Sequence, residues 1–513
     1  MNINALNDDC LSTIFSYIPL KQLILGRRVC THWRQTIDNY LTNERHLVYN
    51  QSINGTKRDQ YFYKYKDNVE ALLDLNQFEC CVQLMPKLTA LTLRGIKAND
   101  AMLPIMATNC PNITRLHVLS GEESLTFVGF KYLCRKYPLL THLDLPNCQL
   151  DDDLIHIIAT SLHELTHFNF ATDRNRAVRN YRLSRFTGQT LRHIAPRIRS
   201  LMIGESMYWD EQLIQSLMTS AVRHTVTTLQ IHLIKLKSLR AICDGMPQLR
   251  EFYCSFNGGD INTHENNVGC VRHLHQLKNL EALELIDDGR HHCGINGCHS
   301  VYTLSTLMEA VNGMSRLRVL RLIDFDNWHS QKPNIDPLLA ELKRFCPHLV
   351  EFAISAGLFQ LKTESYGLIG LLDVPTLTIQ GDSSLQVADP PYSSKHNYLT
   401  NEVVVDLLKA TKSLRRLKVE NSQQIDEEAI NGCLEVSAAR SRRQIELIFC
   451  NIRLNSVSQI TTKLPENVSL VVNKDEEVID LDDYTDGSSS SFDTSDSDSI
   501  HLFSDDDDFD GDI

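Results

Sequence analysis

The sequence predicts an α/β solenoid, in which short parallel strands alternate with helices along the chain. The strands are predicted by one apolar phrase: an apolar residue, two others, a second apolar residue, one other and a third, as in Leu88, Leu91 and Leu93. The phrase returns at a mean spacing of about 30 residues, which is the period of a stacked repeat. Its later copies begin at Ile113, Leu140, Leu165, Ile198, Val226, Leu249, Leu280, Leu317, Leu349, Val374 and Leu414.

The end of each phrase alternates as a β-strand does. The last two apolar positions are two apart and point to one face, while the residue between them points to the other. A strand followed by about 20 residues of helical pattern cannot bury its apolar face alone, so the units must stack with strands inside and helices outside. Two degenerate copies, at residues 444–449 and 468–472, are predicted to close the array.

The phrase and its period resemble leucine-rich repeats, particularly the irregular, cysteine-containing kind. Cys148 and Cys450 each follow a predicted strand, as the cysteine of that family does. The resemblance covers residues 85–472 and implies a horseshoe of about 12–14 irregular repeats. The residues leave one alternative open, an α/β domain with irregular strand spacing.

Residues 1–45 have the pattern of a small helical unit. Asn7 or Asp8 can cap a first helix whose apolar face recurs at i, i+3, i+4 and i+7, and which Pro19 ends. A short second helix follows, and apolar residues every four positions from Leu25 to Ile37 predict a third. Because the core of three such helices is very small, the unit is expected to rely on a partner or on the next domain for stability.

The same segment resembles an F-box, in the order of the apolar and aromatic residues of LNDDCLSTIFSYIPLKQLILGRRVCTHWRQTID. The resemblance implies that the unit docks on the Skp-type adaptor of a cullin-RING ubiquitin ligase. Asn7 stands where that family usually has proline, although asparagine is also a good helix cap. The alternative is a helical cap that seals the first repeat. The adaptor contacts that the resemblance implies are Leu6, Ile14, Phe15, Ile18, Pro19, Leu20, Leu23, Val29, Cys30 and Trp33.

Residues 46–84 are predicted to be a linker or capping element. The aromatic run from Tyr61 to Tyr65 lies among lysines, a combination that also occurs on nucleic-acid-binding surfaces. We favour a strand or connecting element that packs the F-box rigidly onto the solenoid.

No phosphate-binding glycine loop, HExxH or GxSxG motif is present. The inner surface of the solenoid is therefore the expected binding site, because a curved row of strands holds polar side chains in fixed register for a partner protein. Its mixed charge argues against nucleic acid, which usually requires a basic stripe. The residues expected to contact a protein substrate are His117, Asp144, Asn169, Tyr253, Glu284 and Arg321.

These features predict a non-catalytic substrate-recognition subunit of an SCF-type ubiquitin ligase, which marks a protein for proteasomal degradation. Other subunits would transfer ubiquitin while this chain holds the substrate nearby. The alternative is a leucine-rich-repeat protein whose acidic tail binds histones or other basic proteins as a scaffold or chaperone. Proteins of that kind lack an F-box.

A histidine- and cysteine-rich segment lies between residues 255 and 300, where nine such residues fall within 36 positions. Thiolate and imidazole are the preferred ligands of zinc, which can organise a loop that lacks a core. The spacing matches no compact zinc finger, so we expect no cofactor and treat zinc as the alternative. Elemental analysis of the purified protein tests it. The candidate ligands are His291, Cys293, Cys298 and His299.

Residues 473–513 are predicted to be a disordered acidic tail. From Asp475 onward the chain holds 16 of its 64 acidic residues and neither Lys nor Arg, while the remainder carries 51 basic and 48 acidic residues, a net charge of +3. Such a composition cannot offset the entropy of ordering. The run Val478, Ile479, Asp480 and Leu481 resembles a SUMO-interacting motif, a strand that adds to a sheet edge. Nearby serines among acidic residues suit phosphorylation.

The composition favours an intracellular protein, in the cytoplasm, the nucleus or both. The 15 cysteines are odd in number and scattered, which suits reduced thiols better than a disulfide framework. No apolar run reaches the roughly 18 residues of a membrane helix, and the start, MNINALNDDC, does not resemble a signal peptide.

Overall fold

The computed structural model divides the chain into two units, Met1–Asn473 and Lys474–Ile513. All described residues belong to the first unit. The described residues are 6–18, 20–50, 71–72, 75–94, 96–97, 99–119, 125–145, 151–170, 189–194, 196–203, 210–234, 236–256, 268–287, 304–324, 334–355, 363–381, 399–422, 424–440, 444–453 and 464–473.

The first unit is built on one parallel sheet of 15 strands, in the order β1-β3-β5 and then β6 to β17 in sequence. A separate short pair joins β2 (Ala71–Leu72) to β4 (Ile96–Lys97). The strands of the large sheet are β1 (His46–Asn50), β3 (Ala90–Arg94), β5 (Arg115–Leu119), β6 (His142–Asp144), β7 (His167–Phe170), β8 (Ser200–Ile203), β9 (Thr228–Ile234), β10 (Glu251–Phe256), β11 (Ala282–Asp287), β12 (Val319–Asp324), β13 (Glu351–Ser355), β14 (Thr376–Gln380), β15 (Arg416–Ser422), β16 (Ile445–Ile452) and β17 (Val468–Asn473).

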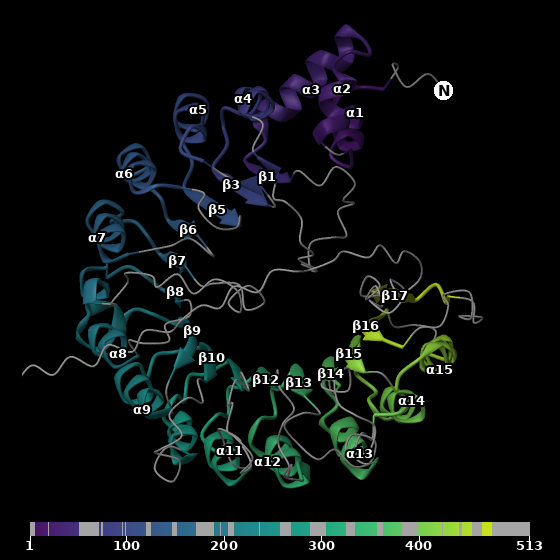
Figure 1. Cartoon of the computed structure of the whole chain (residues 1–513). Helices are drawn as coiled ribbons and strands as arrows, with labels where there is room; N and C mark the ends of the chain where they lie inside the picture. The colour runs from purple at the N-terminus through teal and green to yellow at the C-terminus, as the bar shows by residue number, and fades with distance from the viewer. Residues whose placement is uncertain are drawn as a thin grey trace, which may run out of the picture. The chain divides into compact units, whose positions relative to one another are not determined.

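Helices connect successive strands and lie on the outer side of the curved sheet (Figure 1). Some connections use 3-10 helices, labelled η, in place of α-helices. The helices are α1 (Asp8–Phe15), α2 (Leu20–Gly26), α3 (Thr31–Asn43), α4 (Leu75–Gln83), α5 (Met102–Asn109), α6 (Phe127–Lys136), α7 (Asp152–Ser161), η3 (Gln189–His193), α8 (Asp210–Thr219), η4 (Ala221–His224), α9 (Leu236–Gly245), η6 (Val268–Gln276), α11 (Leu304–Val311), α12 (Asp336–Phe345), α13 (Thr363–Leu372), α14 (Asn401–Ala410) and α15 (Glu427–Ala438).

The apolar phrases stack in register, as the sequence predicts. Leu91 pairs with Leu116, Leu116 with Leu143 and Leu143 with Phe168, and all four side chains are buried. Each phrase places its apolar residues in one continuous core between the sheet and the helices. The repeat fold is therefore confirmed, including both predicted closing strands, β16 and β17.

The sheet begins earlier than the sequence indicated. Strand β1 pairs in parallel with β3, and α4 follows before the first predicted phrase. Part of the segment predicted as a linker, residues 46–84, is thus the first unit of the solenoid. The apolar phrase is not recognisable there because β1 reads His-Leu-Val-Tyr-Asn. Tyr49 occupies the second core position, and Val48 lies on the exposed inner face of the sheet.

Threonine hydroxyls join neighbouring repeats just before the strands. The hydroxyl of Thr114 donates to the carbonyl oxygen of Thr89 at 3.3 Å, Thr141 to Thr114 at 3.1 Å and Thr166 to Thr141 at 3.0 Å. The backbone N–H groups of the same residues donate to the same carbonyl oxygens. Each of these threonines therefore contacts the preceding repeat through both its hydroxyl and its backbone N–H group.

The outer layer has a comparable contact between helix starts. Thr126 caps α6 by accepting from the N–H of Gly129, and its own N–H donates to Oδ1 of Asp100 in the preceding repeat at 2.9 Å. Its hydroxyl donates to the other oxygen of the same carboxylate. Gly129 leaves room for that carboxylate, since a Cβ built there would lie 1.9 Å from Oδ1 of Asp100.

Replacing Gly129 by alanine is therefore expected to lower the free energy of unfolding by about 1–2 kcal/mol, because the new methyl group displaces Asp100 from the cap. Gly367, in the middle of α13, is the matched control: a Cβ there meets nothing within 4 Å. Gly367→Ala should stabilise the helix by up to about 1 kcal/mol. Urea denaturation measures both, and equal effects of the two substitutions would contradict the packing described here.

Candidate functional site

The N-terminal helices form a small unit with a shared aromatic contact. Asn7 caps α1 by accepting from the N–H of Cys10 at 2.9 Å, as the sequence predicts. Phe15 packs edge-on against Trp33 with ring centroids 5.3 Å apart. Ile37 on α3 is fully buried in the same core.

Two polar contacts between helices fix their arrangement. Arg27, after α2, donates to both carboxylate oxygens of Asp38 on α3, at 2.6 and 3.3 Å. The hydroxyl of Thr36 donates to Asp8 at the start of α1, at 3.2 Å. A bidentate guanidinium–carboxylate pair sets orientation as well as distance, so the three helices present a defined surface.

The structure separates the ten predicted adaptor contacts by burial. Phe15 and Leu23 are buried in the unit's own core, whereas Ile14 and Val29 are exposed. Pro19 lies outside the described residues. The remaining five are partly buried: Leu6, Ile18, Leu20, Cys30 and Trp33.

The third helix is shorter than its predicted pattern. It begins at Thr31, with the Sγ of Cys30 accepting from the N–H of Trp33 at 3.4 Å. Leu25 therefore belongs to α2 and Val29 to the turn after it. The four-residue spacing continues across the turn by coincidence, and the side chains of Leu25 in α2 and Val29 in the turn are both exposed.

Exposed apolar side chains are concentrated in this unit. Of the ten large apolar side chains that are exposed in the described parts of the chain, four fall between residues 14 and 29: Ile14 at 37%, Tyr17 at 75%, Leu25 at 51% and Val29 at 60%. These four are called the exposed apolar set below. The sequence analysis missed Tyr17 and Leu25 as exposed residues, because helical periodicity does not show which apolar side chains of a small unit stay uncovered.

The helical unit is joined directly to the first repeat. Only Glu44 and Arg45 separate α3 from β1, and the carbonyl oxygen of Arg45 accepts from the N–H groups of Thr89 and Ala90 at 2.9 and 3.0 Å. The ammonium group of Lys87 donates to the side chain of Asn43 at 2.8 Å. The connection between the two parts is thus strand β1 of the sheet itself.

The predicted substrate-contacting residues lie in a single row across the inner face. His117 pairs with Asp144 and Asp144 with Asn169, while Tyr253 pairs with Glu284 and Glu284 with Arg321. Two strands, β8 and β9, lie between the two groups. The row is not uniformly open, since Glu284 is only 6% exposed.

An acidic cluster occupies the centre of the inner face. Arg321 donates to Glu351 at 2.7 Å and to Glu284 at 3.0 Å. Burial alone would lower the pKa of Arg321, but the hydrogen bonds and charges of Glu351 and Glu284 raise it above its usual value. Burial, followed by the charge of Glu251, raises the pKa of Tyr253 to about 12. The cluster contains the carboxylates of Glu251, Glu284 and Glu351 and the guanidinium of Arg321, so it carries an excess of negative charge.

The N-terminal part of the inner face is rich in histidine. His142 and His167 stack with ring centroids 4.2 Å apart and planes 12° from parallel. His117 forms a close contact through Nδ1 with Oδ2 of Asp144. Burial first, then the charges of His167 and Arg115, lower the pKa of His142 to about 4. The sequence analysis included His117 but missed the stacked pair, which lies in a second row two residues earlier in each strand.

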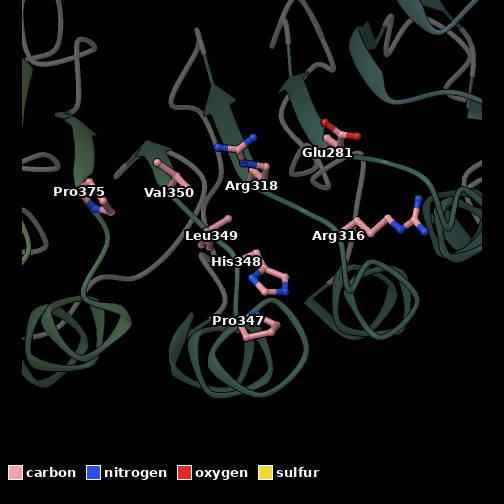
Figure 2. A pocket seen from close by; sticks show the side chains of 8 residues that line it. All are labelled: Glu281, Arg316, Arg318, Pro347, His348, Leu349, Val350 and Pro375. Atoms are coloured by element: carbon pink, nitrogen blue, oxygen red, sulfur yellow. The ribbon is translucent and has the colours of Figure 1, made fainter.

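A shallow depression lies at the edge where helices turn into strands β11 to β14 (Figure 2). Arg316 there donates to the side chain of Asn279 at 3.1 Å, and Glu281 forms an ion pair with Arg250 at 3.8 Å. The groups hold neighbouring turns together and include no nucleophile paired with a base. The lining residues are Glu281, Arg316, Arg318, Pro347, His348, Leu349, Val350 and Pro375.

The described residues contain no group of three or more His, Cys, Asp or Glu arranged to hold a metal ion. The predicted zinc ligands, His291, Cys293, Cys298 and His299, lie outside them, as does the predicted SUMO-interacting run from Val478 to Leu481. Both stay predictions. None of the described helices is long and apolar enough to cross a membrane.

Comparison with known proteins agrees with the N-terminal unit described above. Residues 3–44 match the family model of the F-box domain. No curated protein matches the chain.

Two solved structures resemble the solenoid. The complex of Rad7 and Elc1 from yeast matches with a TM-score of 0.43 at 12% identity, over 80% of this chain and 88% of that chain. The leucine-rich-repeat-containing protein LegL7 from Legionella pneumophila matches with a TM-score of 0.30 at 13% identity, over 75% and 90%. With scores this low, neither likeness enters the functional argument. The sequence match and the parallel sheet together make the chain an F-box domain followed by a solenoid of leucine-rich-repeat type.

Proposed function

We propose that the chain is the substrate-recognition subunit of an SCF-type ubiquitin ligase. Its F-box domain binds the Skp-type adaptor, and through it the cullin and RING subunits. The inner face of the solenoid binds a protein substrate. The observation that carries the proposal is the coincidence of the F-box match at residues 3–44 with the exposed apolar set between residues 14 and 29.

The exposed apolar set supports docking on energetic grounds. Fully burying one large apolar side chain stabilises a protein by about 1.5–3 kcal/mol, so four left in water in so small a unit indicate a surface that a partner covers. Phe15, Ile37 and the Arg27–Asp38 pair hold that surface in one arrangement before the partner arrives. A preformed surface loses little conformational entropy on binding.

The inner face supports the second half of the proposal. Parallel strands hold its polar side chains in fixed register, and their charge changes along the sheet from the histidine-rich part at β5 to β7 to the acidic cluster at β10 to β13. Complementary charge of this kind selects partners and sets their orientation more than it adds affinity. The chain needs no catalytic group for this role, since the ligase acts by holding the substrate close to the ubiquitin-carrying subunit.

The direct test is the affinity for the adaptor of a variant carrying Leu25→Glu and Val29→Glu. Both side chains are more than half exposed, so the substitutions should leave the fold intact. Carboxylates placed in an apolar interface should weaken binding at least ~30-fold, or about 2 kcal/mol. Val128→Glu is the matched control, because Val128 is 72% exposed on α6. Titration by isothermal calorimetry that gave unchanged affinity for the double variant would remove the proposal.

The alternative function, binding histones or other basic proteins without a ligase, makes a different prediction for the same experiment. Such a protein would bind its partners without any adaptor, and the Leu25 and Val29 substitutions would change nothing. The F-box match favours the ligase subunit, because the acidic-tail proteins of that alternative lack the domain.

A further inference from the structure

Three basic side chains form a row across strands β5, β6 and β7. Arg115 pairs in register with His142, and His142 with His167. The two imidazole rings are stacked, and all three residues lie on the inner face beside the row that contains His117 and Asp144. This set of Arg115, His142 and His167 is called the histidine row below.

The threonine hydroxyls described above lie beside one ring nitrogen of each histidine. The hydroxyl of Thr141 is 3.1 Å from the carbonyl oxygen of Thr114 and 2.8 Å from Nδ1 of His142. The hydroxyl of Thr166 is 3.0 Å from the carbonyl oxygen of Thr141 and 3.3 Å from Nδ1 of His167. With each hydroxyl donating to its carbonyl oxygen, Nδ1 of the neutral ring donates to the hydroxyl, and the Nε2 lone pair is left to accept a proton or a ligand.

Arg115 is the one permanent cation of the row, because both histidines have lowered pKa values and are neutral at neutral pH. The charges of Arg115, His117 and His167 oppose protonation of His142, and the charge of Asp144 favours it. For His167, the charges of Asp144 and Glu251 favour protonation, and those of Arg115 and His117 oppose it. Asp144 is already engaged by His117. In the described part of the chain, no carboxylate lies within ion-pair distance of Arg115, and Asp144 and Glu251 are the negative charges that act on the histidines of the row.

We propose that the histidine row is a proton-coupled binding site for an acidic segment of the partner protein. The inference rests on the proposed function, in which the inner face recognises a substrate, and it assigns that substrate a chemical class. Carboxylates of the segment pair with Arg115, and each can accept a hydrogen bond from Nε2 once that nitrogen is protonated. Neutral rings offer only lone pairs there, so binding and protonation support each other.

The direction of the pH dependence follows from the free and bound states. Burial and the neighbouring cations lower the pKa of both histidines, that of His142 to about 4. A bound anion offsets those cations and raises both pKa values. Between the free and bound pKa values the complex holds more protons than the free protein, so affinity increases as the pH falls. Each proton taken up contributes at most a tenfold gain per pH unit.

The acidic cluster gives the bound segment an expected direction. Five strand spacings separate β5 from β10, or roughly 24 Å at the usual distance between strands. An extended peptide covers that distance in about seven residues. A segment that places basic residues about seven positions from its acidic ones would match both parts of the inner face.

The test is the binding of a rhodamine-labelled hexaglutamate peptide to the full chain, followed by fluorescence anisotropy between pH 7.5 and 5.5 at constant ionic strength. Glutamate carboxylates stay ionised over this range, so the probe itself does not titrate. Affinity is expected to rise at least about twofold across the range. Hexalysine should bind no better at pH 5.5 than at pH 7.5, and a phosphoserine peptide of equal length shows whether phosphate replaces carboxylate.

Variants separate the row from the rest of the surface. His142→Gln with His167→Gln keeps hydrogen-bonding side chains but should remove the pH dependence, and Arg115→Gln should weaken binding at every pH. His163→Gln is the control, because His163 is exposed in the turn before β7 and lies outside the row. A pH dependence that survives in the double variant, or no binding of hexaglutamate by the wild-type chain, would overturn the proposal.

A second readout does not depend on substitutions. The ring Cε1–Hε1 NMR signals of His142 and His167, recorded in the labelled full chain, should titrate at least one pH unit higher with saturating hexaglutamate than without it. Unchanged titration would also refute the site. The peptide-binding and NMR measurements use no adaptor, so a chain that does not bind the adaptor can still give the expected results. Failure of the ligase proposal and failure of this site are therefore distinguishable.

Discussion

Substitution of Phe252 by alanine is expected to lower the free energy of unfolding by about 3–5 kcal/mol. Phe252 lies in β10 near the middle of the sheet, pairs in register with Leu229 and Leu283, and is fully buried. Removing its ring leaves a cavity between the sheet and the outer helices that neighbouring strands cannot close without breaking their own register. The loss therefore combines lost apolar burial with the cost of the cavity.

The control for this prediction is Phe127→Ala. Phe127 begins α6 and is 46% exposed, so its removal should cost less than about 1 kcal/mol. Guanidinium denaturation with circular dichroism measures both changes. Because repeats contact only their neighbours, the Phe252 variant can unfold in more than one step, and hydrogen exchange should then show weakest protection at β9 to β11. Similar losses for the two phenylalanines would mean that the core is not organised as described.

Replacement of Arg321 by leucine is the second large effect expected, a loss of about 3 kcal/mol in stability. Removing one partner of a buried ion pair costs about 3–5 kcal/mol, and the lower end applies because the Arg321 side chain is 35% exposed. The substitution removes the guanidinium that donates to the nearly buried carboxylate of Glu284 and to Glu351. Adding Glu284→Gln should restore part of the loss.

A second ion pair on the same face provides the comparison. Arg416 and Glu446 lie 3.4 Å apart on β15 and β16, and the side chain of Glu446 is 42% exposed, whereas that of Glu284 is 8% exposed. Arg416→Leu should change stability by less than about 1 kcal/mol, as is usual for a surface pair. Thermal unfolding of the three variants and the wild-type chain completes the test. If Arg321→Leu and Arg416→Leu destabilised equally, Glu284 would not depend on its cation.

The repeat could be predicted from the sequence because its signal is redundant. Each copy of the phrase is weak, but twelve copies at similar spacing support one another, and every strand they predicted is present. The same redundancy fixed the register, so that His117, Asp144 and Asn169 do lie side by side. The cap at Asn7 was predictable because it depends on one local hydrogen bond.

Other features depended on contacts that no local pattern contains. β1 was missed because a single copy with Tyr49 in a core position matches the phrase poorly. Leu25 and Val29 kept helical spacing while the chain left the helix at Gly26. The stacked pair of His142 and His167 depends on the register of β6 and β7, which brings the two rings together. Sequence gives the order of such groups, but the stacking distance between repeats decides which of them meet.

Hydrogen exchange of the full chain, with and without a purified Skp-type adaptor, tests the central claim most directly. The account predicts slower exchange of backbone amides in α1 to α3, strongest around Ile14 to Val29, and unchanged exchange in β10 to β13 of the inner face. It is contradicted if a folded chain and a folded adaptor, mixed at micromolar concentration, leave the exchange of residues 8–30 unchanged.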